Sequence, residues 1–379
     1  MNFWNTFAAL FSNFGALTWQ MVVMWGIGAL LIYLAIVKKM EPSLLLPMGF
    51  GAILVNLPAS GAITQGDTVG PISALFEAGM SNELFPLLLF IGIGAMIDFG
   101  PLLEKPWLML FGAAAQFGIF FTLFLAGFFF DMKDAASIAV IGAADGPTAI
   151  FVANTLKSQY LGAIMVAAYS YMALVPIVQP PVIRLCTTKK ERLIRMPYHK
   201  GSVSKTTKIL FPIVVTMLAG LVAPASVALV GFLMFGNLLR ECGVLNALSE
   251  TAQNVLANLI TIVLGLTVAG QMTADKFVRP DTLLILALGL VAFIFDTAGG
   301  VFFAKLLNLF LPEGKKINPM IGAAGISAFP MSGRVVNQMG LAEDNQNFLL
   351  MYSISVNVSG QIASVIAGGL ILTLMSSCV

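Results

Sequence analysis

The stretch IGAADGPTAIF, residues 141–151, places a carboxylate and a helix break inside an apolar segment. Asp145 is the one charged residue within positions 135–156, and Gly146 and Pro147 follow it directly. Proline removes a backbone hydrogen bond inside a helix, and a charge at the centre of a membrane helix costs about 2.5–3.5 kcal/mol. The stretch therefore predicts a broken or re-entrant helix tip in a membrane protein. We expect Asp145 to face a polar interior as a functional residue rather than a simple cap.

The composition agrees with a membrane protein. The chain has 379 residues, of which 58% are hydrophobic and 10% are charged, against about 25% charged in an average soluble domain. This composition excludes a soluble enzyme or a disordered regulator, and the net charge of +2 is too small for a nucleic-acid-binding protein. At about 20 residues per span, the chain has room for roughly ten to twelve spans.

Apolar runs with few charges locate the expected spans. They cover residues 17–37, 42–57, 84–97, 106–130, 158–183, 209–239, 251–274, 282–304 and 345–379. Pro224 divides the 209–239 run into two short crossings. Basic residues accumulate on the cytoplasmic side, so we expect the basic cluster at 184–208 to lie inside, together with Lys38 and Lys39. The number of crossings between them allows this only if the first tip re-enters the membrane instead of crossing it. The same treatment of residues 318–333 predicts five crossings in each half and both chain ends outside.

The two halves of the sequence repeat each other. Four matches occur in the same order: Gly49-Phe50 with Gly231-Phe232 (231 − 49 = 182), Ile141 with Ile321 (321 − 141 = 180), Gln159 with Gln338 (338 − 159 = 179), and Tyr169-Ser170 with Tyr352-Ser353 (352 − 169 = 183). An odd number of crossings inverts the second half, and inverted repeats with paired broken segments are typical of a transporter-like core. We expect an interfacial segment at 1–16, repeats at 17–184 and 209–379, and a basic cytoplasmic linker at 185–208.

The two tips offer oxygen ligands of the kind that Na⁺ prefers. The first tip supplies the Asp145 carboxylate and the Thr148 hydroxyl. The second tip, NPMIGAAGISAFPMSGR at 318–334, supplies neutral oxygens from Asn318 and Ser327, and Gly325 takes the place of Asp145. The last span carries the polar residues Asn357, Ser359 and Gln361, which cannot all face lipid and indicate a polar interior.

Several residues have two interpretations. Arg334 either clamps a carboxylate with two hydrogen bonds or anchors the cytoplasmic side. Asp296, which matches Gln116 in the repeat (296 − 116 = 180), is either a second ion or proton ligand or a residue that bonds a broken segment. Tyr169 and Tyr171 lie in mid-span, where packing is the usual role, and His199 is interpreted as a solvated loop residue.

Other chemistries lack support. The three cysteines have no metal-ligand spacing, and the chain has no P-loop, so ATP-driven pumping is unsupported.

Four segments closely resemble the membrane-embedded beta subunit of the biotin-dependent, sodium-pumping decarboxylases, the family of the oxaloacetate, methylmalonyl-CoA and glutaconyl-CoA decarboxylases. They are IGIGAMIDFGPLL (91–103), IGAADGPTAIFVA (141–153), NPMIGAAGISAFPMSGRVVNQ (318–338) and NVSGQIASVIAGG (357–369). The resemblance extends from about residue 17 to the end. It implies that the chain decarboxylates carboxybiotin, which a partner subunit carries, and couples this to Na⁺ export with uptake of an external proton.

The resemblance also implies residue roles and partners. Asp145 falls on the family's Na⁺ ligand and coupling residue. Further functional positions of the family fall on Tyr171, Asn318, Gly322, Ser327, Arg334 and Asn357. The resemblance implies that Arg334 binds carboxybiotin and that Tyr171 and Ser327 are candidates for proton delivery and Na⁺ ligation. The resemblance also implies that this subunit forms a homotrimer in the bacterial inner membrane, where it is surrounded by lipid and has an elevator-like moving core. The implied partners are biotin-carrier and carboxyltransferase subunits and a small gamma or delta subunit.

Another function fits the residues without the resemblance. A stand-alone secondary Na⁺-coupled transporter for an organic anion would use Arg334 to bind the substrate carboxylate and would need no biotin. A channel is disfavoured by the buried Asp145 and the paired tips. No biotin-attachment segment occurs in the sequence, so biotin is expected in trans, and the choice of acid belongs to another subunit.

Overall fold

The computed structural model describes residues 12–197, 201 and 203–376, and its regular elements are helices apart from one isolated β-bridge between Gln65 and Thr68. His199 and most of the predicted interfacial segment lie outside the described residues. Of that segment, Ser12–Ala16 forms a short 3₁₀ helix, η1.

Seven helical segments in the described part of the chain are long and apolar enough to cross a membrane. They are Trp19–Ile36, Pro106–Ala126, Leu161–Cys186, Lys205–Val222, Asn246–Ala269, Pro280–Phe310 and Leu350–Met375. Pro71–Met80 and Leu84–Met96, bent by 66° at their junction, make an eighth if they count as one span. The prediction of a polytopic all-helical membrane protein is therefore confirmed. The prediction of five crossings in each half is not confirmed. Only seven or eight helical segments of the described chain are long enough to cross a membrane, and the predicted span Pro42–Val55 has 14 residues.

The helices follow one another in a similar order in the two halves. The first half contains α2 (Trp19–Ile36), α3 (Pro42–Val55), α4 (Pro71–Leu75), a π-helical turn η2 (Phe76–Met80), α5 (Leu84–Met96), α6 (Gly100–Glu104), η3 (Pro106–Leu108), α7 (Met109–Ala115), α8 (Phe117–Ala126), α9 (Met132–Ala139), η4 (Val140–Ala143), α10 (Gly146–Thr155) and α11 (Leu161–Cys186). After α12 (Lys189–Arg192), the second half contains α13 (Lys205–Val222), η5 (Pro224–Ser226), α14 (Val227–Glu241), α15 (Asn246–Glu250), a π-helical turn η6 (Thr251–Leu256), α16 (Ala257–Ala269), α17 (Ala274–Phe277), α18 (Pro280–Phe310), η7 (Pro319–Gly325), α19 (Met331–Glu343) and α20 (Leu350–Ser376). A π-helical turn stands before the α5 and α16 helices alike, and both halves end with a broken segment and a long helix.

The chain divides into two compact units that each draw on both halves of the sequence. The first contains the chain up to Phe85 together with Leu259–Leu284. In this unit α2 packs against α3. The Asn56 side chain donates to the carbonyls of Ala52 (2.7 Å) and Met272 (2.8 Å) and accepts from the Ala274 amide (2.7 Å). This amide therefore ties the end of α3 to the turn between α16 and α17.

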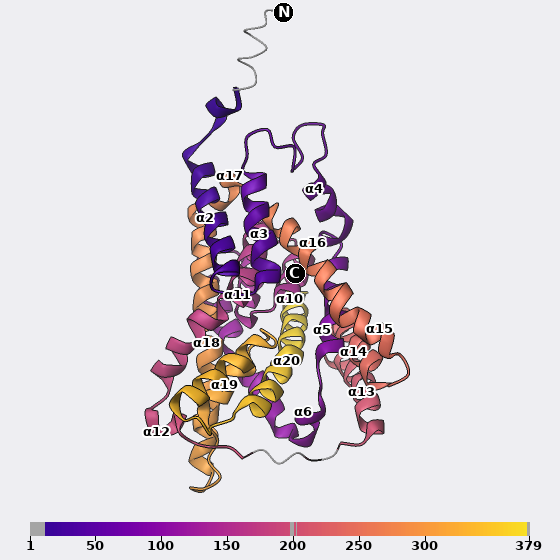
Figure 1. The fold of residues 1–379 in the computed structure, drawn as a ribbon, viewed down its shortest axis with the longest axis vertical. Helices are drawn as coiled ribbons and strands as arrows, with labels where there is room; N and C mark the ends of the chain where they lie inside the picture. Colours follow the sequence, from indigo (N-terminus) through magenta and orange to yellow (C-terminus); the bar gives the residue numbers. More distant parts are fainter. Residues whose placement is uncertain (1–11, 198–200, 202, 377–379) are drawn as a thin grey trace, which may run out of the picture. The chain divides into compact units, whose positions relative to one another are not determined.

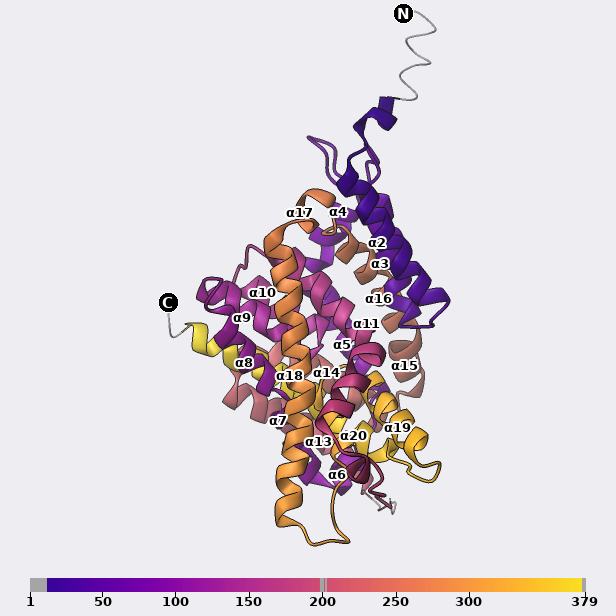
Figure 2. The same ribbon diagram turned by 90° about the vertical axis from the view of Figure 1, so that its left-hand side faces the viewer.

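The second unit contains Pro86–Asn258 and the chain from Ile285 onward, and it holds all the predicted site residues. The long helix α20 lies at its centre and packs against α7, α10, α19 and η7 (Figure 1). In the most apolar 18-residue stretch of α20, 72% of the residues are buried, against 11% in α13. From Ile285 onward α18 belongs to this unit, and Figure 2 shows α18 as one unbroken helix.

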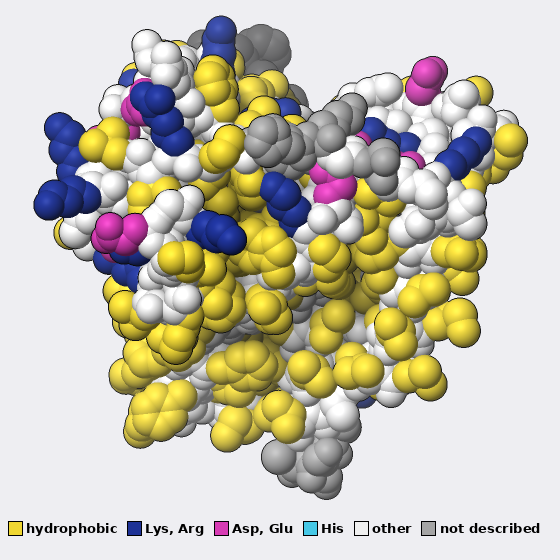
Figure 3. Space-filling model, turned by 90° about the horizontal axis from the view of Figure 1, so that it is seen from below, with side chains coloured by type: hydrophobic (Ala, Val, Ile, Leu, Met, Phe, Trp, Pro, Cys, Tyr) yellow, Lys and Arg dark blue, Asp and Glu magenta, His cyan; other side chains and the backbone are white. Residues whose placement is uncertain are grey.

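Apolar side chains cover the outer faces of several helices of this unit. Phe117, Phe120 and Phe124 of α8 are 53%, 42% and 65% exposed, and Leu221 of α13 is 81% exposed. In the view of Figure 3, Lys and Arg side chains gather along one side of the face and hydrophobic side chains dominate the rest. Such a surface suits lipid contact and not water.

Candidate functional site

The first tip is a helical hairpin broken at Ala144 and Asp145. The 3₁₀ turn η4 ends at Ala143, Ala144 takes a left-handed conformation (φ 51°), and Asp145 is extended. The helix α10 then begins at Gly146, with Pro147 in its first turn, where the missing amide is no loss. The sequence therefore folds into the predicted break, and it leaves the Asp145 side chain 3% exposed in the protein interior.

Neutral donors surround the Asp145 carboxylate. Its Oδ2 accepts hydrogen bonds from Thr148 Oγ1 (2.7 Å), Gln361 Nε2 (3.1 Å) and Ser364 Oγ (3.0 Å). Gln361 and Ser364 are three residues apart and share one face of α20. No Lys or Arg forms an ion pair with Asp145 among the described residues. A buried carboxylate without a counter-ion is costly, so this site is suited to a cation.

The second tip meets the first through the main chain. The 3₁₀ helix η7 ends at Gly325, the chain continues extended from Ile326, and α19 begins at Met331. The Ser327 amide donates to the Ala143 carbonyl (2.9 Å). Asn357 Nδ2 of α20 donates to the Ile326 carbonyl (2.7 Å). The two tips and α20 therefore form one connected structure.

Three buried oxygens beside these contacts have no hydrogen-bond partner among the described residues. They are Ser327 Oγ, Asn357 Oδ1 and the Tyr169 hydroxyl. Ser327 and Tyr169 both lie close enough to interact with the Asp145 carboxylate. The Tyr169 ring covers Gly146, where a Cβ atom would lie 2.4 Å from it. Such unpaired oxygens are able to coordinate a small cation.

Three predicted residues have their polar atoms engaged elsewhere. Asn318 Nδ2 donates to the carbonyls of Arg192 and Ile194 (both 2.9 Å), and its Oδ1 accepts from the Met320 amide (3.1 Å). The Tyr171 hydroxyl donates to the Leu286 carbonyl, and the Ser359 hydroxyl donates to the carbonyls of Leu108 and Val356. Asn318 therefore caps η7 and holds the linker, and none of the three has a contact with Asp145.

Two further predicted residues lie on the second tip. Gly322 crosses α18 at Gly300, and a Cβ atom on Gly322 would lie 2.0 Å from the Gly300 carbonyl oxygen. The two segments can therefore cross this closely only because residue 322 has no side chain. Arg334 is exposed on α19, and its guanidinium has no partner among the described residues. It is therefore free to receive an anion.

The Asp296 side chain accepts a hydrogen bond from α8, next to the break between α7 and α8. The chain leaves the helical path at Gln116, between α7 and α8, and Asp296 Oδ1 of α18 accepts from the Ile119 amide (3.2 Å). This supports the second of the two sequence-based interpretations of Asp296. Its Oδ2 has no partner in the described chain and faces Gly142 of the first tip, where a Cβ atom would lie 2.7 Å away.

Outside the spans, Asp98 forms an ion pair. Its Oδ1 accepts from the Gly100 amide (2.8 Å) and from Lys208 Nζ (3.0 Å). Burial by itself would raise the pKa of Asp98, but the Gly100 amide and Lys208 outweigh burial, and the pKa is lowered. The predicted basic linker therefore contributes an ion pair to the start of α6.

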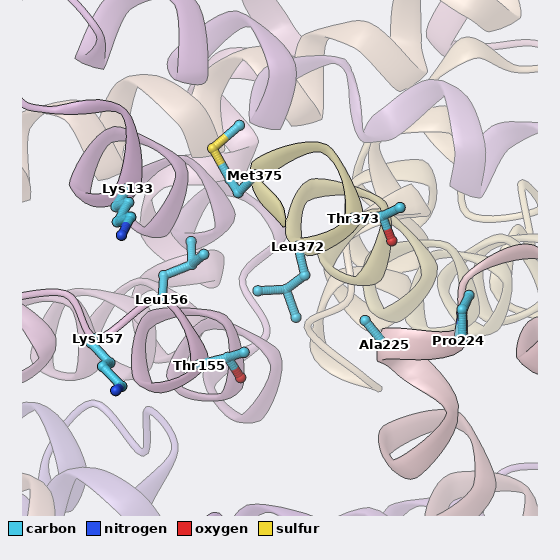
Figure 4. A pocket seen from close by; sticks show the side chains of 9 residues that line it. All are labelled: Lys133, Thr155, Leu156, Lys157, Pro224, Ala225, Leu372, Thr373 and Met375. Carbon is cyan, nitrogen blue, oxygen red and sulfur yellow. The ribbon is translucent and has the colours of Figure 1, made fainter. Parts of the chain in front are cut away.

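A cavity of about 670 Å³ lies beside the ends of the first tip. It is lined by Lys133, Thr155, Leu156, Lys157, Pro224, Ala225, Leu372, Thr373 and Met375. Figure 4 shows Leu156 and Leu372 extending between α10 and α20, with both lysines on one side. None of these residues is among the hydrogen-bond partners of Asp145 or the other ion-binding candidates.

The chain matches the family model described as "Na+-transporting oxaloacetate decarboxylase beta subunit" over residues 20–375. It belongs to this family. The glutaconyl-CoA decarboxylase beta subunit of Acidaminococcus fermentans is 47% identical over 96% of both chains. The methylmalonyl-CoA decarboxylase beta subunit of Propionigenium modestum is 46% identical over 96% of this chain and 97% of that one. The oxaloacetate decarboxylase beta chain of Klebsiella pneumoniae is 44% identical over 92% of this chain and 94% of that one.

The beta-subunit family and the apolar helices together give the setting of the site. The protein is a multi-pass subunit in the bacterial inner membrane, and it belongs to a multi-subunit complex in which decarboxylation is coupled to Na⁺ transport. The resemblance seen in the sequence is therefore confirmed.

The structure of this beta subunit adds two residues that the sequence did not single out, Ser364 and Gln179. Ser364 completes the donors on Asp145, while Tyr169, interpreted from its mid-span position as a packing residue, contacts the first tip. Gln179 of α11 binds the second tip. The spacing of Ser364 from Gln361 was a usable signal, because residues three apart share a helix face.

Proposed function

We propose that this subunit decarboxylates carboxybiotin presented by a biotin-carrying partner and exports Na⁺ in exchange for an external proton. The observation that carries the proposal is the meeting of the two tips at a buried carboxylate. Asp145 has three neutral donors, and where the second tip meets the first, buried oxygens of Ser327 and Asn357 have no partner among the described residues. A transported Na⁺ would supply the charge that this site lacks.

Na⁺ would be held by Asp145, Thr148, Ser327 and Asn357, with Tyr169 as an additional oxygen. The described residues contain no group of three or more His, Cys, Asp or Glu side chains placed to hold a metal. One carboxylate with neutral oxygens balances a single positive charge, which favours a monovalent cation over a divalent one. Asn318 would act from a distance, because its side chain holds the linker against η7.

Carboxybiotin supplies a carboxyl group that leaves as CO₂, and the biotin nitrogen keeps the bonding electron pair and takes up a proton. The exposed guanidinium of Arg334, which has no partner among the described residues, fits a carboxylate, since two parallel hydrogen bonds match its geometry. Ser327 belongs to the same tip as Arg334, and its amide bonds the Ala143 carbonyl of the first tip, so it would sense both substrates. Tyr171 would deliver the proton only after its hydroxyl leaves the Leu286 carbonyl.

Transport would follow an elevator-type movement of inverted repeats in a trimer. The similar order of helices in the two halves and the division into two compact units support this proposal. Moving one Na⁺ outward against 100 mV costs about 2.3 kcal/mol, which decarboxylation would supply. An empty, ionised Asp145 is costly in a closed site, so uncoupled movement would be suppressed.

Replacing Asp145 tests the proposal. In the reconstituted decarboxylase complex, Asp145→Asn should abolish ²²Na⁺ uptake into inverted vesicles and the stimulation of decarboxylation by Na⁺, because the amide cannot balance the charge of the cation.

Asp134→Asn is the matched control. Asp134 is also buried at the first tip, but Ser158 Oγ (2.6 Å) and Gln159 Nε2 (3.1 Å) bind both of its oxygens. It should retain Na⁺ uptake. Na⁺-stimulated decarboxylation that survives in Asp145→Asn would refute the proposed site.

A further inference from the structure

The amide of Gln179 connects the two limbs of the second tip. Gln179 is 0% exposed, in the part of α11 that also contains Pro176, Pro180 and Pro181. Its Nε2 lies 2.7 Å from the Ala323 carbonyl and 2.7 Å from Ser332 Oγ, while the Ser332 hydroxyl lies 3.0 Å from Gln179 Oε1. Ala323 belongs to η7 and Ser332 to α19, so one side chain from the first half closes the second tip.

Gln179 and Gln361 play crossed roles in the two halves. They are separated by 361 − 179 = 182 residues, within the range of the repeat offsets. Gln361, in the second half, donates to Asp145 of the first tip. Gln179, in the first half, donates to Ala323 of the second tip. Each half therefore uses a buried glutamine in its long helix to hold the tip of the other half.

The second tip is fixed at three points around Ser327. Gln179 holds the Ala323 carbonyl, Asn357 holds the Ile326 carbonyl, and the Ser327 amide donates to Ala143 of the first tip. The Ser327 hydroxyl remains without a partner among the described residues. Because two of the three anchors bind backbone carbonyls, they fix the main chain and thereby the direction of the Ser327 side chain.

The far limb of the tip leads to Arg334. Ser332 is 0% exposed and stands two residues before Arg334, on the first turn of α19. Its hydroxyl also lies 3.2 Å from the Ala323 carbonyl, inside the same network. A shift of α19 when Arg334 takes up an anion would therefore pull on Gln179, and through Ala323 on the segment that bears Ser327.

We propose that Gln179 is a positioning residue that links the carboxylate-binding end of the second tip, at Arg334, to its Na⁺-binding end, at Ser327. The inference rests on the proposed function of these two residues. Gln179 itself contacts neither substrate. Its amide sets the distance between the two limbs, so that occupancy of one end changes the affinity of the other.

The test replaces Gln179 with methionine, which has similar length but cannot donate or accept these hydrogen bonds. In the reconstituted complex, Gln179→Met should raise the Na⁺ concentration for half-maximal decarboxylation about tenfold, the loss expected when a buried hydrogen-bond pair is removed. The number of Na⁺ ions moved per decarboxylation should fall, while the maximal rate at saturating Na⁺ changes less. A purely structural role would lower the amount of folded protein without altering these two quantities.

The matched control and a milder variant complete the design. Gln159→Met makes the same change at the base of the first tip, where the glutamine binds Asp134, and should leave the Na⁺ dependence unchanged. Ser332→Ala removes one part of the link and should raise the half-saturating Na⁺ concentration about threefold, which keeps the proposal testable if Gln179→Met does not fold.

Wild-type Na⁺ dependence and coupling in folded Gln179→Met, or in Ser332→Ala when the methionine variant does not fold, would overturn the inference. If Asp145→Asn abolishes Na⁺ stimulation at the same time, the proposed function survives and only the role of Gln179 fails. If Asp145→Asn keeps Na⁺ stimulation, the proposed function fails first.

Discussion

At the residue scale, two buried aspartates of this subunit have different surroundings. Asp145 accepts from three side chains at a break in the first tip, whereas Asp296 accepts from a main-chain amide at the start of α8. The first helical amides of α8 have no partner inside that helix. Asp296 therefore satisfies a backbone requirement that any acceptor of similar shape would meet, while the role proposed for Asp145 requires its charge.

We expect the two roles to separate on substitution of Asp296. Asp296→Ala removes the side-chain acceptor of the Ile119 amide, which keeps its bond to the Gln116 carbonyl (3.1 Å), and should reduce stability by about 1 kcal/mol, whereas Asp296→Asn retains an acceptor oxygen and should lose much less. Thermal unfolding in detergent, followed by the Tm, measures the difference. Equal losses in both variants would show that the negative charge itself is required.

Neighbouring residues on one helix also show what the sequence can predict. The break at Asp145 followed from a charge, a glycine and a proline inside an apolar run, and the structure has it at that position. The contacts of Tyr169 and Tyr171 did not follow, because residues two apart on a helix point in directions about 200° apart. Only the packing of α11 decides that Tyr169 covers Gly146 and that Tyr171 reaches α18.

At the element scale, the linker around α12 is docked and not free. Arg192 pairs with Glu343 (2.6 Å), Arg195 with Asp344 (2.5 Å) and Lys305 with Glu191 (3.2 Å). The sequence indicated a basic cytoplasmic loop but not these partners, since ion pairs between residues more than 100 positions apart depend on tertiary packing. The same limit explains why Asn318 matched a functional position while its bonds to the Arg192 and Ile194 carbonyls were not foreseen.

The pairing of Asp344 gives a pH prediction. The hydrogen bond from Arg195 lowers the pKa of Asp344 below its usual value of 3.8. A lowered folded-state pKa stabilises the fold above the unfolded value, and this contribution is lost as the pH falls through the folded value. The Tm difference between wild type and Asp344→Asn should therefore be positive at pH 5–6 and shrink toward zero below pH 3.8. A difference that grows on acidification would contradict the assignment.

At the scale of the whole molecule, the order of helices supports two repeats, and inversion remains a prediction with a direct test. If the halves are inverted, the bases of the two tips lie on opposite sides of the membrane. Lys157, at the end of α10, and Lys315, before η7, are both exposed.

Single cysteines at these positions, in a background with the three native cysteines replaced by serine, report the side of each base. Lys157→Cys should react with a membrane-impermeant maleimide in intact cells, and Lys315→Cys only after permeabilisation, because basic loops lie inside. Labelling of both from the same side would exclude inverted repeats. The control is Lys38→Cys, predicted inside.

The joint between the tips has a consequence for how such pumps diversify. The Ser327–Ala143 contact uses an amide and a carbonyl, which every residue except proline provides on the donor side and every residue on the acceptor side. The scaffold that brings the two tips together is therefore largely indifferent to side-chain identity at the joint itself. Mutation can exchange the side chains that select an ion while the meeting point persists, so ion preference and overall architecture are free to evolve separately.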